Sequence, residues 1–180
     1  PRPRPAPPPP HTPGALGMKL IITDLQDLPF RVEGEHQVIG PGGGPLHPCT
    51  GCFGCWVRTP GRCVIPDGYQ NTGIAMSRCD RLILGSSCCY GSLSPFVKGV
   101  LDRAISYVHP DFVFRDGEMH HKRRYQDRVT LSAWFYGEDI TRAEQETARG
   151  IIAANALNYD TAVGEVRFFP SPEGMKEVAL

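Results

Sequence analysis

The amino-acid sequence predicts an α/β fold with a central parallel sheet. Two apolar runs, residues 18–24 and Arg81–Ser87, are nearly continuous, as is typical of strands buried on both faces of a parallel sheet. Helix-start signals follow the strands: Ser94 stands before Pro95, and residues 141–144 have the pattern of a capping box. Strands that alternate with helices favour parallel pairing through right-handed crossovers.

Length and composition limit the possible function classes. The chain has 180 residues, which is enough for one domain with a real core. Its 19 basic and 19 acidic residues give no net charge, so a nucleic-acid partner is not expected. No apolar run approaches the roughly 18–20 residues of a membrane-spanning helix. No secretion signal is visible, and seven cysteines without one indicate reduced thiols in the cytoplasm.

The N-terminal residues differ in composition from the rest. Residues 1–17 are dominated by proline and have almost nothing to bury, so we expect an extended, disordered leader. Met18 is the expected functional start, and residues 18–180 are expected to form a single domain.

The first strand, residues 18–24, precedes a polar stretch in which only Val38 and Ile39 suggest a further short strand. The Gly- and Pro-rich residues 40–45 are expected to be a linker without regular structure. Only 24 residues separate Asp24 from Cys49, too few for a loop, a full helix and a second strand. The first βα unit is therefore expected to be shortened.

The middle of the chain continues the alternation. Residues 67–79 are expected to form a short helix, followed by the strand Arg81–Ser87. The helix that begins at Pro95 has a stripe of apolar residues at helical spacing. The expected exposed face of this helix carries Lys98, Asp102 and Arg103.

The last third is interrupted once. Residues 109–127 contain proline, glycine and a basic tract, and are expected to form an excursion or small hairpin. A strand is expected over residues 128–135, a helix after the capping box, and a last strand over residues 166–169. We expect residues 170–180 to be a surface tail.

The fold class predicts where a ligand binds. In open parallel sheets, ligands lie outside the carboxyl ends of the strands. This rule selects three loops: the one after Asp24, residues 86–94 and residues 136–139.

Four of the seven cysteines fall in fifteen residues, with the spacing C-x2-C-x2-C-x7-C. They are Cys49, Cys52, Cys55 and Cys63. Clustered thiols on a Gly- and Pro-rich loop indicate a soft metal centre or a thiol–disulfide couple, although reduced packed thiols remain an alternative. Zinc is the competing metal, but its sites usually come as two separated pairs.

The other candidate metal ligands give weaker signals. Cys88 and Cys89 are adjacent, and small-residue packing is preferred to a strained vicinal disulfide. Cys79 is expected in the core. His109, His120 and His121 match no metal template and are expected at the surface or at a subunit contact.

Two motifs together resemble the flavodoxin-like NAD(P)H-dependent FMN reductase and iron–sulfur flavoprotein family. The first runs from Cys49-Thr-Gly-Cys-Phe-Gly-Cys-Trp through Pro60-Gly-Arg-Cys63 to Asp67. The second is Tyr90-Gly-Ser-Leu-Ser-Pro-Phe-Val-Lys-Gly-Val-Leu-Asp-Arg103. The resemblance covers about residues 47–107 and implies a flavodoxin-like three-layer sandwich that binds FMN, with NAD(P)H as electron donor and a small molecule or protein as acceptor.

The resemblance also implies site residues. The flavin would lie against two loops, whose residues are Ser86, Ser87, Cys88, Cys89, Tyr90, Gly91, Ser92, Tyr136 and Gly137. In the iron–sulfur members the cysteine motif holds a 4Fe–4S cluster, which would make Cys49, Cys52, Cys55 and Cys63 its ligands next to the flavin loop. A homodimer or larger homo-oligomer is implied as well.

One departure from the family concerns the phosphate. Family members hold the FMN phosphate with a loop and helix N-terminus after the first strand. Here Asp24 and Asp27 follow that strand, and they offer carboxylates where donors are needed. Two alternatives therefore stand beside an FMN-dependent oxidoreductase: an accessory protein of the same fold without the cofactor, and a thiol redox sensor.

Overall fold

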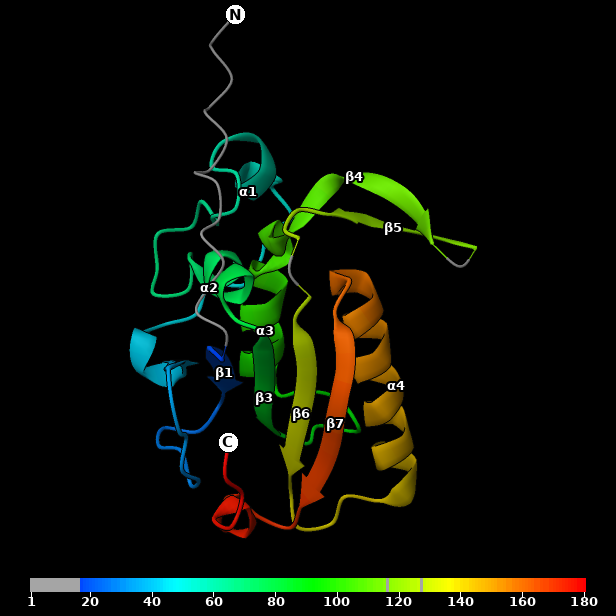
Figure 1. The fold of residues 1–180 in the computed structure, drawn as a ribbon. Coiled ribbons are helices and arrows are strands. Elements are labelled where there is room, and N and C mark those ends of the chain that lie inside the picture. Colours follow the sequence, from blue (N-terminus) through cyan, green and yellow to red (C-terminus); the bar gives the residue numbers. More distant parts are fainter. Residues whose placement is uncertain (1–16, 116, 127) are drawn as a thin grey trace, which may run out of the picture.

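A five-stranded parallel sheet forms the centre of the computed structural model, which describes residues 17–115, 117–126 and 128–180 (Figure 1). Its strands are β1 (Lys19–Thr23), β2 (His36–Ile39), β3 (Arg81–Ser87), β6 (Thr130–Tyr136) and β7 (Ala162–Phe169). The order β2-β1-β3-β6-β7 is the flavodoxin order of doubly wound folds. The predicted fold class is confirmed. Of the expected leader, residues 1–16 lie outside the described part.

The register places the carboxyl ends of the central strands together. Thr23 at the end of β1 pairs with Gly85 of β3, and Ser87 pairs with Tyr136 at the end of β6. All four pairings in this sheet are parallel, so the loops after β1, β3 and β6 leave the sheet at one edge.

Helices cover one face of the sheet. They are α2 (Thr72–Arg78), α3 (Pro95–Arg103) and α4 (Arg142–Tyr159), and they enclose the larger apolar core (Figure 1). Both predicted helix starts are confirmed: Ser94 Oγ accepts a hydrogen bond from the Val97 N–H, and Thr141 forms the capping box with Glu144. In the described part of the chain, no helix is both long and apolar enough to cross a membrane.

Irregular chain covers the opposite face. No helix joins β1 to β2, so the first unit is shortened as predicted. Phe30 from this connection packs with Met175 and Val178 against Ile21 and Trp134 of the sheet. The expected surface tail is therefore wrong, because residues 170–180, with the 3-10 turn η3 (Pro172–Met175), supply the cover that a helix would otherwise give.

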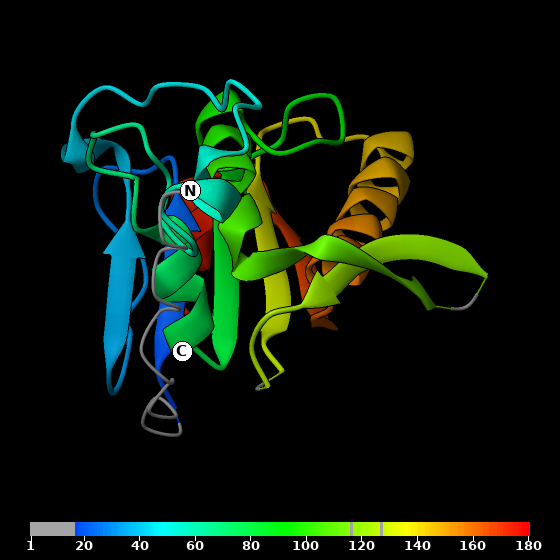
Figure 2. The same ribbon diagram turned by 90° about the horizontal axis from the view of Figure 1, so that it is seen from above.

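The expected excursion is a hairpin of β4 (Val108–Arg115) and β5 (Glu118–Arg123), which follows the 3-10 turn η2 (Ile105–Tyr107). It projects away from the sheet beyond α4 (Figure 2).

Three further segments differ from the sequence-based expectation. The expected linker contains a 3-10 turn, η1 (Pro41–Gly43), and the cysteine segment contains the short helix α1 (Gly54–Val57). The helix expected from residue 67 begins only at Thr72, because Asp67 Oδ1 accepts a hydrogen bond from the Tyr69 N–H and fixes a turn.

Candidate functional site

The carboxyl ends of β1, β3 and β6 are joined by one side chain. Asp24 Oδ2 accepts hydrogen bonds from the Ser87 N–H over 3.0 Å and from Ser87 Oγ over 2.7 Å. Its other oxygen, Oδ1, accepts a hydrogen bond from the Tyr136 hydroxyl over 2.9 Å. The three loops selected from the sequence therefore meet at one point, at the carboxyl edge of the sheet that the fold class predicts.

The turn that follows β3 has an unusual backbone. Cys89 and Ser92 exchange two backbone hydrogen bonds, of 2.9 and 2.8 Å, around Tyr90 and Gly91. These two central residues have φ angles of 53° and 78°, the signs of a type I′ turn. The left-handed conformation is unfavourable for tyrosine, yet the Tyr90 side chain is 94% exposed and gains no packing in return.

Gly91 is required where it lies. A Cβ atom at this position would come within 2.8 Å of both Glu144 O and Thr147 Cβ, at the start of α4. The turn thus rests on the helix terminus, and only Tyr90 projects from it.

The remaining predicted flavin residues support this turn. Ser86 is fully buried and structural: its Oγ accepts a hydrogen bond from the Ser94 N–H over 2.8 Å. The Cys88 N–H donates to Tyr136 O over 2.9 Å, and burial raises the pKa of the Cys88 thiol. Gly137 lies beside Ile140 and Cys88. Cys88 and Cys89 are free thiols, which agrees with the preference for packing over a disulfide.

The cysteine loop lies at the other end of the domain. Arg103, the last residue of α3, contacts Cys63, whereas the first residues of α3 follow the turn at Tyr90. Figure 1 shows the same separation: α1 and the hairpin lie at the top, and the arrowheads of β6 and β7 point to the bottom. The expectation that the cysteine segment lies next to the flavin loop is wrong, because helix α3 leads the chain back to the amino ends of the strands.

A cavity of about 690 Å³ opens beside the cysteine loop. Its wall includes residues from the loop, the end of α3, the hairpin and the end of α4; among them are Cys49, Cys52, Phe53, Cys55, Trp56, Cys63, Arg103, Phe112, His120, His121, Asn155 and Tyr159. The four motif cysteines thus line one cavity whose wall is mainly apolar and aromatic.

This arrangement does not fit a 4Fe–4S cluster, which needs four thiolates that converge on one centre. In residues 17–180, leaving aside 116 and 127, no three His, Cys, Asp or Glu side chains gather closely enough to hold a metal ion. Burial raises the pKa of Cys55 to about 11, and the neighbouring thiols of Cys63, Cys49 and Cys52 add to the increase.

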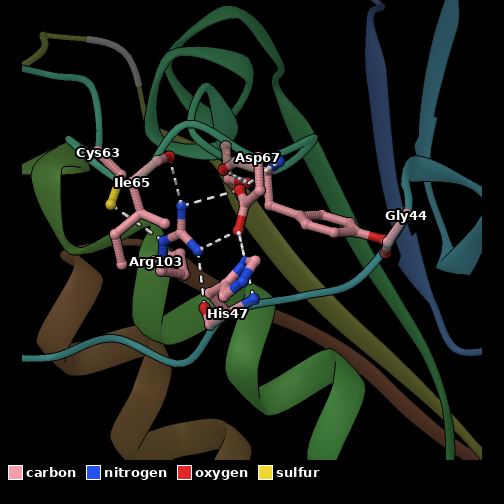
Figure 3. Close-up of polar contacts among 8 residues, drawn as sticks. Gly44, His47, Cys63, Ile65, Asp67 and Arg103 are labelled. Carbon is pink, nitrogen blue, oxygen red and sulfur yellow. Dashed lines mark hydrogen bonds and ion pairs between the residues drawn. The ribbon is translucent and has the colours of Figure 1, made fainter.

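Arg103 holds the cysteine loop in place (Figure 3). Its guanidinium donates to both carboxylate oxygens of Asp67 over 2.8 and 3.0 Å, to His47 O over 2.7 Å and to Ile65 O over 3.2 Å. Its Nε–H donates to Cys63 Sγ over 3.0 Å. The side chain is buried, so its expected place on the exposed face of α3 is wrong.

The hydrogen bonds around Asp67 keep its carboxylate ionised beside Arg103. Burial alone would raise its pKa, but hydrogen bonds from Arg103 and from the Tyr69 and His47 N–H groups hold the pKa far below its usual range. The Tyr69 hydroxyl lies at hydrogen-bond distance from both Gly40 O and Gly44 O, which share its one proton, and so ties the glycine-rich segment to the same network.

The hairpin histidines have structural partners. His121 Nδ1 contacts His109 O over 2.8 Å. The His121 ring stacks on the Phe112 ring, and its centroid lies 5.0 Å from the ring centroid of Trp56. His120 is buried against Glu118 at 3.2 Å. These contacts fix the hairpin against α1 and give no metal site.

The roles of three residues in these hydrogen-bond networks were not predicted from the sequence. Asp24 was seen as a departure from the family but not as a hydrogen-bond acceptor for Ser87 and Tyr136. Arg103 and the acceptor His47 O carry no local signal, since their contact spans 56 residues.

Comparisons with known proteins give limited information. No protein-family model matches the chain, and no curated protein matches it. Among solved structures, a flavone reductase is similar with a TM-score of 0.49 and 12% identity, over 88% of this chain and 55% of that chain. The azoreductase AzrA has a TM-score of 0.47 and 10% identity, over 86% of this chain and 88% of that chain. This chain thus spans about half the length of the flavone reductase, and neither likeness assigns an activity to it.

Proposed function

We propose that this protein is an oxidoreductase of flavodoxin-like fold that binds a flavin at the carboxyl ends of β3 and β6. The observation that supports it best is Tyr90, an exposed aromatic ring held in a left-handed conformation at the carboxyl edge of the sheet, where ligands bind in this fold class. Strain of this kind persists where a side chain has a task other than packing. A flat aromatic wall is what an isoalloxazine ring needs.

The two ends of an FMN molecule fit this site differently. Tyr90 offers an exposed aromatic face for the ring. The phosphate end does not fit, because no helix follows β1 and Asp24 already engages the Ser87 N–H and hydroxyl. A bound flavin would supply hydride and single-electron transfer, with NAD(P)H as the proposed donor and a small molecule or protein as acceptor.

Flavin titration tests the proposal. We expect the purified protein to quench the fluorescence of added flavin with saturation, and to oxidise NAD(P)H only when flavin is present. Tyr90→Ala is expected to weaken flavin binding at least about tenfold, and Tyr90→Phe to leave it nearly unchanged. Phe53→Ala is a matched control, since Phe53 is also exposed and left-handed but lies in the cysteine loop. A protein that quenches no flavin would contradict the proposal and favour the accessory-protein alternative.

A second candidate function is thiol redox chemistry at the cysteine cavity. It is favoured by the contact of the Arg103 cation with Cys63 Sγ and by the lowered pKa of Cys52, whose thiol lies near the Gly54 N–H and the Thr50 side chain. Diamide would take two electrons and two protons from a thiol pair and leave a disulfide within residues 49–63. Mass spectrometry should find that bond and its loss with dithiothreitol. Free thiols after diamide treatment would contradict this function.

The predicted homo-oligomer and cytoplasmic location stay predictions. The hairpin exposes Phe112, Phe114 and Met119, which would suit a subunit contact. Light scattering of the purified protein measures the oligomeric state.

A further inference from the structure

The carboxyl ends of β1 and β3 carry an acidic side chain that belongs to the chain itself. In the flavodoxin strand order this is the switch point at which the cofactor lies. Asp24, which follows β1, reaches Ser87 at the end of β3 and Tyr136 at the end of β6. The contacts span 63 and 112 residues of sequence, so they are a product of the fold and not of a local turn.

The groups that Asp24 engages are of the kind that hold phosphates in proteins. Phosphates at such positions are held by backbone N–H groups and hydroxyls. Here the Ser87 N–H, the Ser87 hydroxyl and the Tyr136 hydroxyl all donate to Asp24. Burial, followed by the hydrogen bond to Asp24, raises the pKa of Tyr136, so this hydroxyl keeps its proton and remains a donor.

The first two N–H groups after β1 already have partners within the protein. The Asp24 N–H donates to Gly85 O over 3.3 Å, and the Leu25 N–H donates to Thr23 Oγ1 over 3.2 Å. In a phosphate-binding loop these N–H groups would point at the ligand and a helix N-terminus would follow. Here residues 24–35 form irregular chain that turns under the sheet.

No cation offsets the carboxylate. Within the described ranges, no Lys, Arg or His side chain lies at ion-pair distance from Asp24; for comparison, Asp67 has Arg103 and Asp160 has Arg115 and Arg123. A phosphate bound at the ends of these strands would therefore meet a like charge at close range without a counter-charge. The proposed ring-binding residue, Tyr90, lies on a separate turn closed by the hydrogen bonds between Cys89 and Ser92.

We propose that this site selects flavins without a phosphate, so that riboflavin, whose side chain carries only uncharged hydroxyls, binds in preference to FMN. The inference rests on the proposed flavin function and names its ligand class. Asp24 is the specificity-determining residue: it engages the donors at the ends of β3 and β6, and its charge repels a phosphate. A flavin held without its phosphate exchanges readily, so it acts as a substrate of the enzyme more than as a fixed cofactor.

The test is a fluorescence titration of the whole chain with riboflavin and with FMN. In the unmodified protein we expect the dissociation constant for FMN to exceed that for riboflavin at least about tenfold at low salt, with a smaller ratio in high salt. In Asp24→Asn the ratio should fall to about threefold or less, mainly through tighter FMN binding. Asp27→Asn, which removes an exposed carboxylate three residues away, should leave the ratio unchanged.

The outcomes separate the two proposals. Tighter binding of FMN than of riboflavin by the unmodified protein overturns the inference and leaves the flavin function intact. Binding of neither flavin overturns both. A ratio that stays the same in Asp24→Asn, with circular dichroism showing a folded variant, shows that Asp24 does not set the preference. If Asp24→Asn does not fold, the comparison of riboflavin and FMN on the unmodified chain still decides the preference. Tyr136→Phe is then the second variant, because it removes one hydrogen-bond donor to Asp24 without changing the charge.

Discussion

The Nε–H of Arg103 donates to the sulfur of Cys63 over 3.0 Å, across 40 residues of sequence. The arginine ends α3, and the cysteine ends the C-x2-C-x2-C-x7-C segment. Through this contact and the ion pair with Asp67, a buried side chain of the helix layer sets the position of a loop that is rich in thiols. The loop is thus part of the folded domain and not a loose attachment to it.

The first prediction concerns this anchor. Arg103→Met leaves the Asp67 carboxylate buried without its partner, and breaking a buried ion pair in this way costs about 3–5 kcal/mol of folding free energy. Urea unfolding measures the loss. Lys98→Met is the matched control on the same helix, because the exposed Lys98–Asp102 pair contributes less than about 1 kcal/mol. Equal losses in the two variants would contradict the assigned role.

The second prediction is a pH dependence. Burial opposes ionisation of Asp67, but the hydrogen bonds from Arg103, Tyr69 and His47 outweigh it and lower the pKa of the folded protein. A carboxyl group with a lowered pKa stabilises the fold above its unfolded pKa of about 3.9, and this contribution disappears as the pH falls toward the folded pKa. The difference in unfolding free energy between the unmodified protein and Asp67→Asn should be constant from about pH 5 to 8 and shrink below about pH 4. A difference that grows on acidification would disprove this reading.

The third prediction orders thiol reactivity. The Gly54 N–H, followed by the Thr50 side chain, lowers the pKa of Cys52, whereas burial and then the neighbouring thiols raise that of Cys55 to about 11. Because the thiolate is the nucleophile, iodoacetamide near pH 7.5 should alkylate Cys52 at least about ten times faster than Cys55. Peptide mass spectrometry over time gives both rates, and in denaturing urea they should become similar. A folded-state rate for Cys55 that matches Cys52 would rule out this order.

The fourth prediction separates stability from binding at Tyr90. Replacing Tyr90 by Gly removes a left-handed tyrosine that is 94% exposed, so we expect a gain of roughly 1 kcal/mol in folding free energy. The same change should weaken flavin binding. Tyr90→Phe keeps both the strain and the ring, and should alter neither quantity. Loss of stability in Tyr90→Gly would mean that the side chain packs against the protein.

The fifth prediction concerns the irregular layer. Met175 is fully buried beneath the sheet, so Met175→Ala should cost about 2–5 kcal/mol in a urea unfolding experiment. Lys176→Ala, at the next position and exposed, should cost less than about 0.5 kcal/mol. Similarly small losses of unfolding free energy in the two variants would mean that residues 170–180 are a surface tail after all.

Local signals predicted much of the fold. The strand Arg81–Ser87 and the helix start at Pro95 follow from an apolar run and a capping pattern, which are properties of neighbouring residues. The capping box at Thr141 is a further case. The rule that ligand loops share the carboxyl edge brought Asp24, Ser87 and Tyr136 together correctly, because it depends on topology alone.

The failures involve contacts between distant segments. Arg103 stands next to the exposed Asp102 in sequence, and its burial arises because residues 47–67 fold over the end of α3. The cover of the second face by residues 170–180 likewise depends on the missing helix after β1. The site of the cysteine loop could not be inferred from its spacing, since spacing gives ligand type but not the end of the sheet at which the loop lies.

Helix α3 connects the two candidate sites of the domain. Its N-cap, Ser94, is hydrogen-bonded to Ser86 beneath the turn of Tyr90, and its last residue, Arg103, holds the cysteine loop. At about 1.5 Å per residue, this single rigid element spans the distance of roughly 14 Å between the two regions. The turn of Tyr90 and the segment of Cys63 are therefore joined to opposite ends of one helix, so the distance between the two regions is set by the length of α3.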